Sequence, residues 1–371
     1  MVVPLAARSV IAVVGALLVL TAWGSVIGTL IVARPAGGWL TRWVDRIINV
    51  AFRMATSSIA DRKRRDRVLA TQAAAILLAQ LVAWLAIFFI GYSLLLWPLI
   101  DSGLGSAFSM ASPGVFGPNA AVGNAEKVVA DLAAFTALVA VTLQIAYLPT
   151  LYSEFNRREN EVALLNARAG VPSWGPELLA RTHYALGSGA STIDTLPDLY
   201  TRWESWAADV AESHTTYLPL VRFRSPRPLS SWVTALLAVL DSAALYLALS
   251  PQSAPTVPAR LCLRSGFQCF TEVARAMGIN VPEVADPSAG ISLSYDEFLD
   301  AVTRMQKVDF PIERNPADAW PDFVGWRVNY EQAAYALAAA VDAVPAMWSG
   351  PRRHRVAAMA PIRPPLGRPP K

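Results

Sequence analysis

Three long apolar segments in the first 150 residues constrain this chain more than any other feature. They run from about Val10 to Val32, from Ala70 to Trp97 and from Val128 to Pro149. A helix needs roughly 20 apolar residues to cross the hydrocarbon core of a bilayer, and each segment reaches that length. The first segment exceeds the apolar core of a cleaved signal peptide. We therefore expect an integral membrane protein with a transmembrane domain over residues 1–150 and spans at 10–32, 70–97 and 128–149.

The basic character of the chain comes from its C-terminal end. The formal net charge is +4, yet residues 351–371 carry six basic residues and no acid, so the remainder is weakly acidic. These basic residues are Arg352, Arg353, Arg355, Arg363, Arg368 and Lys371. Proline is also frequent there, and such a composition favours disorder. We expect a disordered, basic, proline-rich tail over 351–371 that is free in solvent or touches anionic lipid. No nucleic-acid partner is expected.

Orientation in the membrane follows the distribution of Lys and Arg. Nine basic residues lie between the first two spans, whereas Lys127 alone lies between the second and third. This predicts an inner (plasma) membrane protein with its N-terminus outside, residues 34–69 inside, residues 100–124 outside and everything after about residue 150 in the cytoplasm. A basic run at the membrane interface anchors the start of the second span: Arg62, Lys63, Arg64 and Arg65.

Residues 38–56 between the first two spans show a helical period of apolar and polar side chains. The apolar positions are Trp39, Leu40, Trp43, Val44, Ile47, Ile48, Ala51 and Phe52. The polar positions include Arg42, Arg46 and Arg53. A helix with Trp and Arg in this pattern is expected to lie in the headgroup layer of the membrane. An ordinary surface helix packed on the soluble domain is the alternative.

The outer loop, Ile100–Asn124, is rich in Gly and Ser and bears on transport. The apolar run before it is too long for one upright span, so it tilts, projects from the membrane, or breaks near Gly91 or Pro98. A break would let the loop re-enter the membrane and line a watery cavity. The pore-loop candidates are Ser106, Ser109, Met110, Ala111 and Ser112. A packed loop that conducts nothing is the alternative.

A few polar side chains fall within the spans, where they are costly unless they are paired or functional. Asp131 is a candidate for an outer vestibule that concentrates cations, and Thr142 shares its helix face. Asp131 alternatively lies in the first helical turn, where an acid complements the helix dipole. Gln80 and Gln144 are expected to hold helices together by hydrogen bonds.

Residues 151–350 show helical periodicity with loops rich in Pro and Gly, and strand alternation is scarce. The expected helices are 153–169, 175–186, 196–218, 231–249, 259–277, 295–307 and 330–344. Ser294 followed by Glu297 is a capping-box pattern. The segment 233–249 is apolar enough to suggest a fourth span, but Asp241 at its centre favours a buried core helix. The predicted fold class is all-α: three transmembrane helices plus a cytoplasmic α-helical bundle.

The sequence carries no catalytic signature, and no catalytic residue, metal site or cofactor is expected. Cys262 and Cys269 are predicted to be buried thiols, because seven residues of helix hold them about 10 Å apart, too far for a disulfide. His214 next to Ser213 does not define a triad, which depends on spatial geometry. Arg222, Arg224 and Arg227 bind an anionic lipid or phosphate in one interpretation and form a solvated loop in the other.

Several short segments carry a resemblance that covers nearly the whole chain except the tail. They are Ala146–Tyr152, Phe155–Glu159, Leu164–Leu165, Arg168–Gly170 and Trp326–Tyr330. With them the chain resembles a family of uncharacterised bacterial integral membrane proteins, some labelled ion-channel-like. The order of span, outer loop, span and cytoplasmic domain is similar to that of two-helix potassium-channel-like proteins. That family tends to show Thr-Leu-Gly where this chain has Ser109-Met110-Ala111.

Two functional hypotheses from different classes follow. In the first, the protein is an oligomeric ion-conducting pore, a tetramer, with a cytoplasmic regulatory domain. In the second, it is a non-conducting, membrane-anchored scaffold or sensor that acts through its cytoplasmic helices. Membrane lipids are partners in both, and the sequence does not name a cytoplasmic partner. An enzyme is not expected.

Overall fold

The computed structural model describes residues 5–32, 38–100, 105–109, 111, 123–183, 192–286, 288–354 and 356–363. Contacts divide the chain into two compact units, Met1–Ser153 (unit 1) and Glu154–Lys371 (unit 2). The division lies within a few residues of the boundary predicted near residue 150. In the described part of the chain every regular element is helical, and one isolated bridge joins Ala346 and Met359.

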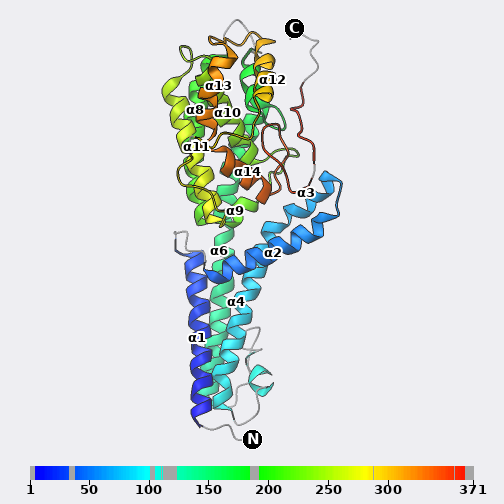
Figure 1. Cartoon of the computed structure of the whole chain (residues 1–371). Coiled ribbons are helices and arrows are strands. Elements are labelled where there is room, and N and C mark those ends of the chain that lie inside the picture. Colours follow the sequence, from blue (N-terminus) through cyan, green and yellow to red (C-terminus); the bar gives the residue numbers. More distant parts are fainter. Residues whose placement is uncertain are drawn as a thin grey trace. The chain divides into compact units, whose positions relative to one another are not determined.

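Unit 1 consists of long helices, coloured blue to green in Figure 1. They are α1 (Leu5–Leu30), α2 (Trp39–Ser57), α3 (Arg62–Ala70), α4 (Gln72–Leu96), the 3₁₀ turn η1 (Trp97–Leu99) and the first part of α6 (Asn124–Ala169). Side chains from α1, α2, α4 and α6 share one apolar core. The helix α4 runs through Gly91 without a break and gives way to the 3₁₀ turn that contains Pro98.

Among the described residues, four helices are long and apolar enough to cross a membrane. Three of them lie in α1, α3–α4 and α6, where 28%, 33% and 33% of the most apolar 18-residue window is buried. Their remaining apolar side chains are exposed or half-buried, as lipid-facing helices require. The fourth, α10 (Trp232–Leu249), is buried over its entire length inside unit 2. This difference favours a core helix, as Asp241 led us to expect.

A close helix crossing in unit 1 joins α1 and α4 through two glycines. A Cβ atom built on Gly15 would lie 2.7 Å from the carbonyl oxygen of Gly91, and one built on Gly91 would lie 2.8 Å from Val19 Cγ2. Only glycine allows backbones to approach this closely. Gly24, which forms a GxxxG pattern with Gly28 in the first span, has open space around its Cα. Ala133 and Ala137, the small pair in the third span, are buried in the unit 1 core.

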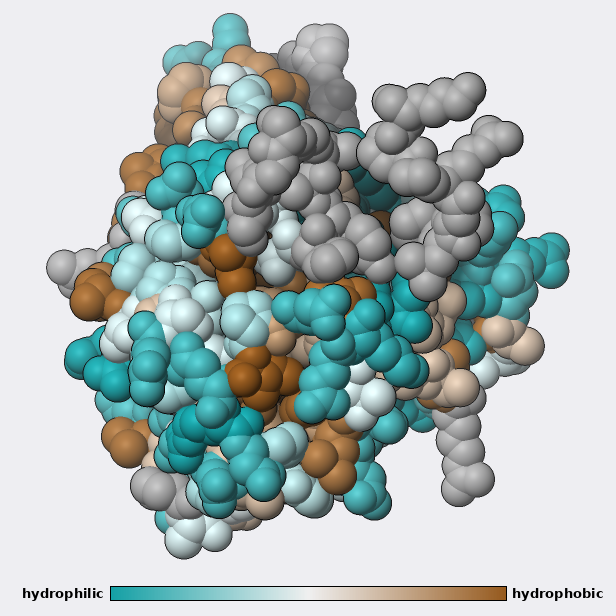
Figure 2. All heavy atoms as spheres, turned by 90° about the horizontal axis from the view of Figure 1, so that it is seen from above, coloured by the Kyte–Doolittle hydropathy of each residue, from teal (hydrophilic) through white to brown (hydrophobic). Residues whose placement is uncertain are grey.

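Unit 2 is a helical bundle arranged around α10 (Figure 1). Its other helices are the end of α6, α7 (Gly175–Ala180), α8 (Leu196–Thr216), α9 (Pro219–Arg222), α11 (Thr256–Ala276), α12 (Tyr295–Gln306), α13 (Pro316–Arg327) and α14 (Glu331–Ala340). The helices α7, α8, α11, α13 and α14 all contact α10. In the face that Figure 2 shows, hydrophilic side chains prevail and apolar ones form separate patches.

Two expectations for unit 2 need correction. The helix α13 was not predicted, because Pro316 and Pro321 indicate a loop, yet Pro316 occupies the first turn, where its missing N–H costs nothing. The tail was predicted to be disordered from residue 351. Residues 351–354 and 356–363 instead pack on unit 2: Arg352 is buried and Ile362 donates a backbone hydrogen bond to Val171 (2.9 Å). Residues 355 and 364–371 lie outside the described residues.

Candidate functional site

The predicted pore loop is described only in part. Residues 105–109 are helical, and Ala107 and Ala111 pack with Leu96 and Ile100 in a small apolar cluster. Ser109 is exposed and donates its hydroxyl hydrogen to the carbonyl of Ser106 (2.9 Å). A helical turn directs its carbonyls along its own axis, unlike the inward ring of an ion filter. Met110 and Ser112 lie outside the described residues.

Polar side chains within the spans of unit 1 bond to one another across helices. Trp84 Nε1 donates to Ser25 Oγ (3.0 Å) and Gln80 donates to Thr41 Oγ1 (3.2 Å). The hydroxyl oxygens of Tyr92 and Thr136 lie 2.7 Å apart, and those of Thr29 and Thr41 lie 3.1 Å apart. The prediction that Gln80 holds helices together is confirmed. These bonds link α1, α2, α4 and α6 within a single chain.

Three further polar residues of α6 have different surroundings. Asp131 and Thr142 are exposed, on the side of α6 away from the buried Ala133 and Thr136. This agrees with the helix face that Asp131 and Thr142 were predicted to share. The vestibule role of Asp131 stays a prediction. Gln144 is buried, and its Oε1 has no hydrogen-bond partner among the residues that the structure describes.

The basic run at the start of the second span is not uniform. Asp61 caps α3 and accepts hydrogen bonds from the backbone N–H groups of Lys63 and Arg64 (both 3.2 Å). The side chains of Lys63 and Arg64 are exposed and free to meet headgroups. Arg65 is buried, and its guanidinium donates to the carbonyl of Ile59. Arg65 is therefore a structural residue that closes the turn between α2 and α3.

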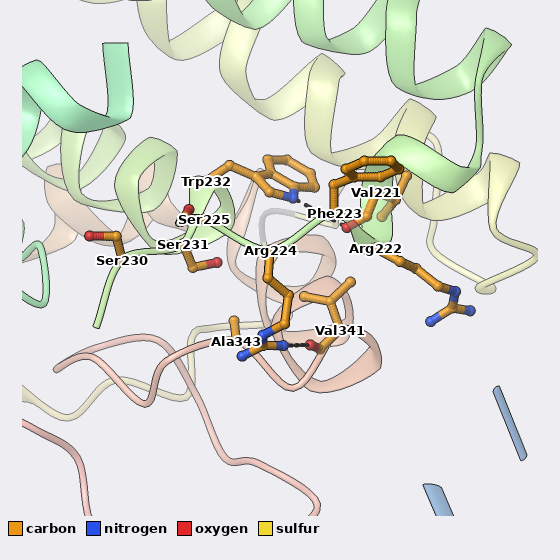
Figure 3. Close-up of a pocket in the computed structure, with 10 residues that line it drawn as sticks. All are labelled: Val221, Arg222, Phe223, Arg224, Ser225, Ser230, Ser231, Trp232, Val341 and Ala343. Atoms are coloured by element: carbon orange, nitrogen blue, oxygen red, sulfur yellow. Dashed lines mark hydrogen bonds between the residues drawn. The ribbon is translucent and has the colours of Figure 1, made fainter. Parts of the chain in front are cut away.

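The arginines around Pro226 in unit 2 do not converge on one ligand position. Arg224 donates to the carbonyls of Val341 (2.8 Å) and Asp342 (3.1 Å) at the end of α14, where a cation complements the helix dipole. Arg227 donates to the carbonyl of Ala163. Figure 3 shows Arg222 directed away from the other residues of the pocket. The phosphate-site interpretation therefore loses its geometric basis.

A small polar pocket nevertheless lies beside Arg224 (Figure 3). Its volume is about 20 Å³, which is room for one water molecule. Ser225 contributes a buried hydroxyl that lacks a hydrogen-bond partner among the described residues, and Trp232 forms one wall. An ordered water bonded to Ser225 would satisfy this group, and a phosphate is too large for the space.

His214 and Arg158 form a buried polar centre close to this loop. Arg158 donates to the carbonyls of Leu220 and Phe223 (both 2.8 Å), to the carboxylate of Glu159 and to His214 Nε2 (2.9 Å). Because arginine cannot accept, Nε2 must be the acceptor and Nδ1 carries the proton toward Ser213 Oγ (3.0 Å). Burial and the charge of Arg158 lower the pKa of His214 well below its usual value. His214 is therefore a neutral structural residue.

A second buried centre joins α10 to α13 and α14. Arg327 donates to Asp241, to Glu331 (3.2 Å) and to the carbonyl of Trp348 (2.7 Å), and Tyr330 donates to Asp241 (2.8 Å). Burial alone would lower the pKa of Arg327, but the adjacent Asp241 carboxylate raises it well above its usual value. The sequence marked Asp241 as a core residue without indicating its partner.

The remaining candidates for chemistry are unreactive in this structure. Cys262 and Cys269 are free and fully buried, and burial raises the pKa of both thiols. Among the described residues no group of three or more His, Cys, Asp or Glu side chains could hold a metal ion. Comparison with known proteins found no match to a family model, a curated protein or a solved structure.

Proposed function

We propose that this protein is a non-conducting, membrane-anchored scaffold or sensor that acts through unit 2. One observation carries the proposal: several buried polar side chains within the candidate spans are engaged inside one chain. Ser25, Gln80 and Thr136 each bond to a side chain of a neighbouring helix of unit 1. Such bonds stabilise a helix bundle and leave these groups unable to line a water-filled pathway.

The outward faces of the same helices support an anchor. Large apolar side chains are exposed along them: Val10, Val13, Leu17 and Leu20 on α1, Leu78 and Val82 on α4, and Val128, Leu132, Phe135, Leu138 and Ile145 on α6. Lipid tails solvate such faces, whereas a pore assembled from several copies needs a polar face. Asp131 and Thr142 are the described features that favour the pore hypothesis.

Unit 2 supplies surfaces suited to a partner. A groove of about 240 Å³ lies between α11 and the 281–285 segment, and its lining includes Phe267, Pro282 and Gln332. Val284 beside it is 81% exposed. A second groove, of about 300 Å³, lies between α6 and α8 and is lined by charged and polar residues such as Arg157, Glu161 and Asp209. Grooves on a helical bundle offer places where a partner can bind.

Ion flux and oligomeric state together test the proposal. We expect the purified full-length chain in liposomes to give no flux above protein-free liposomes across voltage and pH, and a detergent-corrected mass below that of a tetramer. Flux that falls when Asp131 is replaced (Asp131→Leu), or when residues 106–112 are exchanged, would contradict the scaffold and establish a pore. A tetrameric mass together with such flux would also contradict the scaffold.

A further inference from the structure

The helix α2 carries two separate apolar faces, and one of them is exposed, with no cover from the other described residues of unit 1. Leu40 and Val44 are buried against the core that α2 shares with α1 and α4. A second set of large apolar side chains is exposed: Trp39 (54%), Trp43 (52%), Ile47 (59%), Val50 (43%) and Met54 (66%). We call these five residues the α2 stripe. Val50 and Met54 were not recognised from the sequence as part of an apolar face.

The α2 stripe forms a continuous band on the helix surface. At 100° per residue its five side chains fall within an arc of about 80°. The buried pair, Leu40 and Val44, is centred about 80° to one side of the centre of this arc. The exposed Arg42, Arg46 and Arg53 are centred about 80° to its other side. Around the helix the order is therefore protein-facing side chains, exposed apolar side chains, then arginines.

This order matches the environment at a membrane surface. The helix α2 crosses α1 and α4 obliquely (Figure 1), and these are helices with candidate spans. A helix held sideways in this way can place an apolar band toward the lipid tails while arginines on its flank reach the headgroups. Arg46 also lies over the ring of Trp43 (5.3 Å to the centroid), a pairing suited to the interface.

We propose that the α2 stripe inserts into the lipid surface next to the spans, and that Arg42, Arg46 and Arg53 select anionic headgroups. Charge argues against a second copy of the chain as the occupant, because stacking two stripes would bring two rows of arginines together. Anionic headgroups instead neutralise the row. The proposal requires that unit 1 lies in a bilayer and does not depend on the function of unit 2.

Position-specific quenching tests the insertion. The full-length variant Ile47→Cys, labelled with bimane, is placed in phosphatidylcholine–phosphatidylglycerol vesicles, and the native Cys262 and Cys269 stay unlabelled because they are buried. We expect doxyl-labelled lipids to quench the bimane and aqueous iodide to leave it unaffected. Val284→Cys, at an exposed aliphatic residue of unit 2, is the matched control and should behave in the opposite way. Quenching of position 47 by iodide would show that water covers the α2 stripe, and quenching by neither agent would show that protein covers it. Either result would overturn the insertion.

Headgroup selection is measured on the same bimane at position 47. We expect doxyl-phosphatidylglycerol to quench it more than doxyl-phosphatidylcholine at equal mole fraction. The difference should be lost when Arg42, Arg46 and Arg53 are all changed to Gln. A control with three exposed arginines of unit 2 changed to Gln should retain it: Arg202, Arg264 and Arg275. Equal quenching by the two lipids in the Ile47→Cys variant with its arginines intact would refute the selection of anionic headgroups. The insertion itself would still be decided by the iodide experiment.

Discussion

Three of the four arginines that are buried among the described residues of unit 2 act as internal cross-links. Arg158, Arg327 and Arg352 are each less than 9% exposed. Arg352 donates to the carbonyls of Ala343 (2.8 Å), Val344 (2.7 Å) and Ser349 (2.7 Å), which ties the chain after α14 into one compact turn. A buried guanidinium is tolerable only when its five N–H donors find acceptors, so each arginine holds several segments in fixed positions.

The Arg327 centre gives a prediction for single residues. Replacing Arg327 by Met leaves Asp241 buried without its cation, and breaking a buried pair costs about 3–5 kcal/mol. For a unit of this size we expect the melting temperature to fall by roughly 6–20 °C. The double variant Arg327→Met with Asp241→Leu removes both charges and should recover part of the loss. Scanning fluorimetry of the full-length protein in detergent measures this, and an equally unstable double variant would argue against an ion-pair origin.

The roles of these arginines could not be predicted from the sequence. The sequence shows Arg158 only as a basic residue after the third span. Apart from the adjacent Glu159, its partners lie more than 50 residues away in the chain: His214, Leu220 and Phe223. Arg352 was assigned to a solvated tail on composition. Composition and spacing report charge, whereas the acceptors of a buried side chain depend on tertiary contacts that a single sequence does not reveal.

At the scale of elements, local signals were reliable where they act within one helix. The capping box at Ser294 and Glu297 is present, and α10 forms over the apolar run that begins after Ser231. The three apolar segments became the helices expected of them because length and hydropathy are properties of the segment itself. Packing between helices was harder to predict: the crossing of α1 and α4 uses Gly15 and Gly91, whereas Gly24 of the GxxxG pattern has open space around it.

The crossing of α1 and α4 can be tested with two matched substitutions. Gly91→Leu forces a side chain against Val19 and the backbone of Gly15, and overpacking of this kind costs about 1–3 kcal/mol. Gly24→Leu adds the same side chain where the structure has open space. We expect Gly91→Leu alone to lower the temperature at which the full-length protein loses helical circular dichroism in detergent. Equal losses in both variants would mean that Gly24 also lies at a close contact, as in an assembly of several chains.

At the scale of the molecule, the C-terminal segment, residues 356–363, packs against the outside of the helices of unit 2. Residues 356–363 are fixed by the Ala346–Met359 bridge, by the Ile362–Val171 hydrogen bond and by Glu177. Glu177 in α7 is almost fully buried and accepts hydrogen bonds from Arg181 (3.1 Å), Arg304 (2.9 Å) and Arg363 (3.1 Å). One carboxylate thus joins α7 to α12 and to the C-terminal segment, although Arg304 and Arg363 lie 127 and 186 residues from Glu177 in the chain.

Glu177 therefore controls how firmly the C-terminal segment is held. Burial alone would raise its pKa, but hydrogen bonds and charges from Arg304, Arg181 and Arg363 lower the pKa below its usual value. A lowered carboxyl pKa stabilises the fold above the unfolded value of about 4.3, and this stability is lost as the pH falls through the folded-state pKa.

Hydrogen bonds to a charged group contribute about 1.5–3 kcal/mol, so Glu177→Gln should lower amide-exchange protection over 356–363 roughly 10- to 100-fold at neutral pH. After correction for intrinsic exchange rates, the native protein should approach the variant in acid. Glu283→Gln, at a side chain that is 82% exposed, is the control and should leave protection unchanged. Unchanged protection in Glu177→Gln would mean that the backbone contacts hold the segment by themselves.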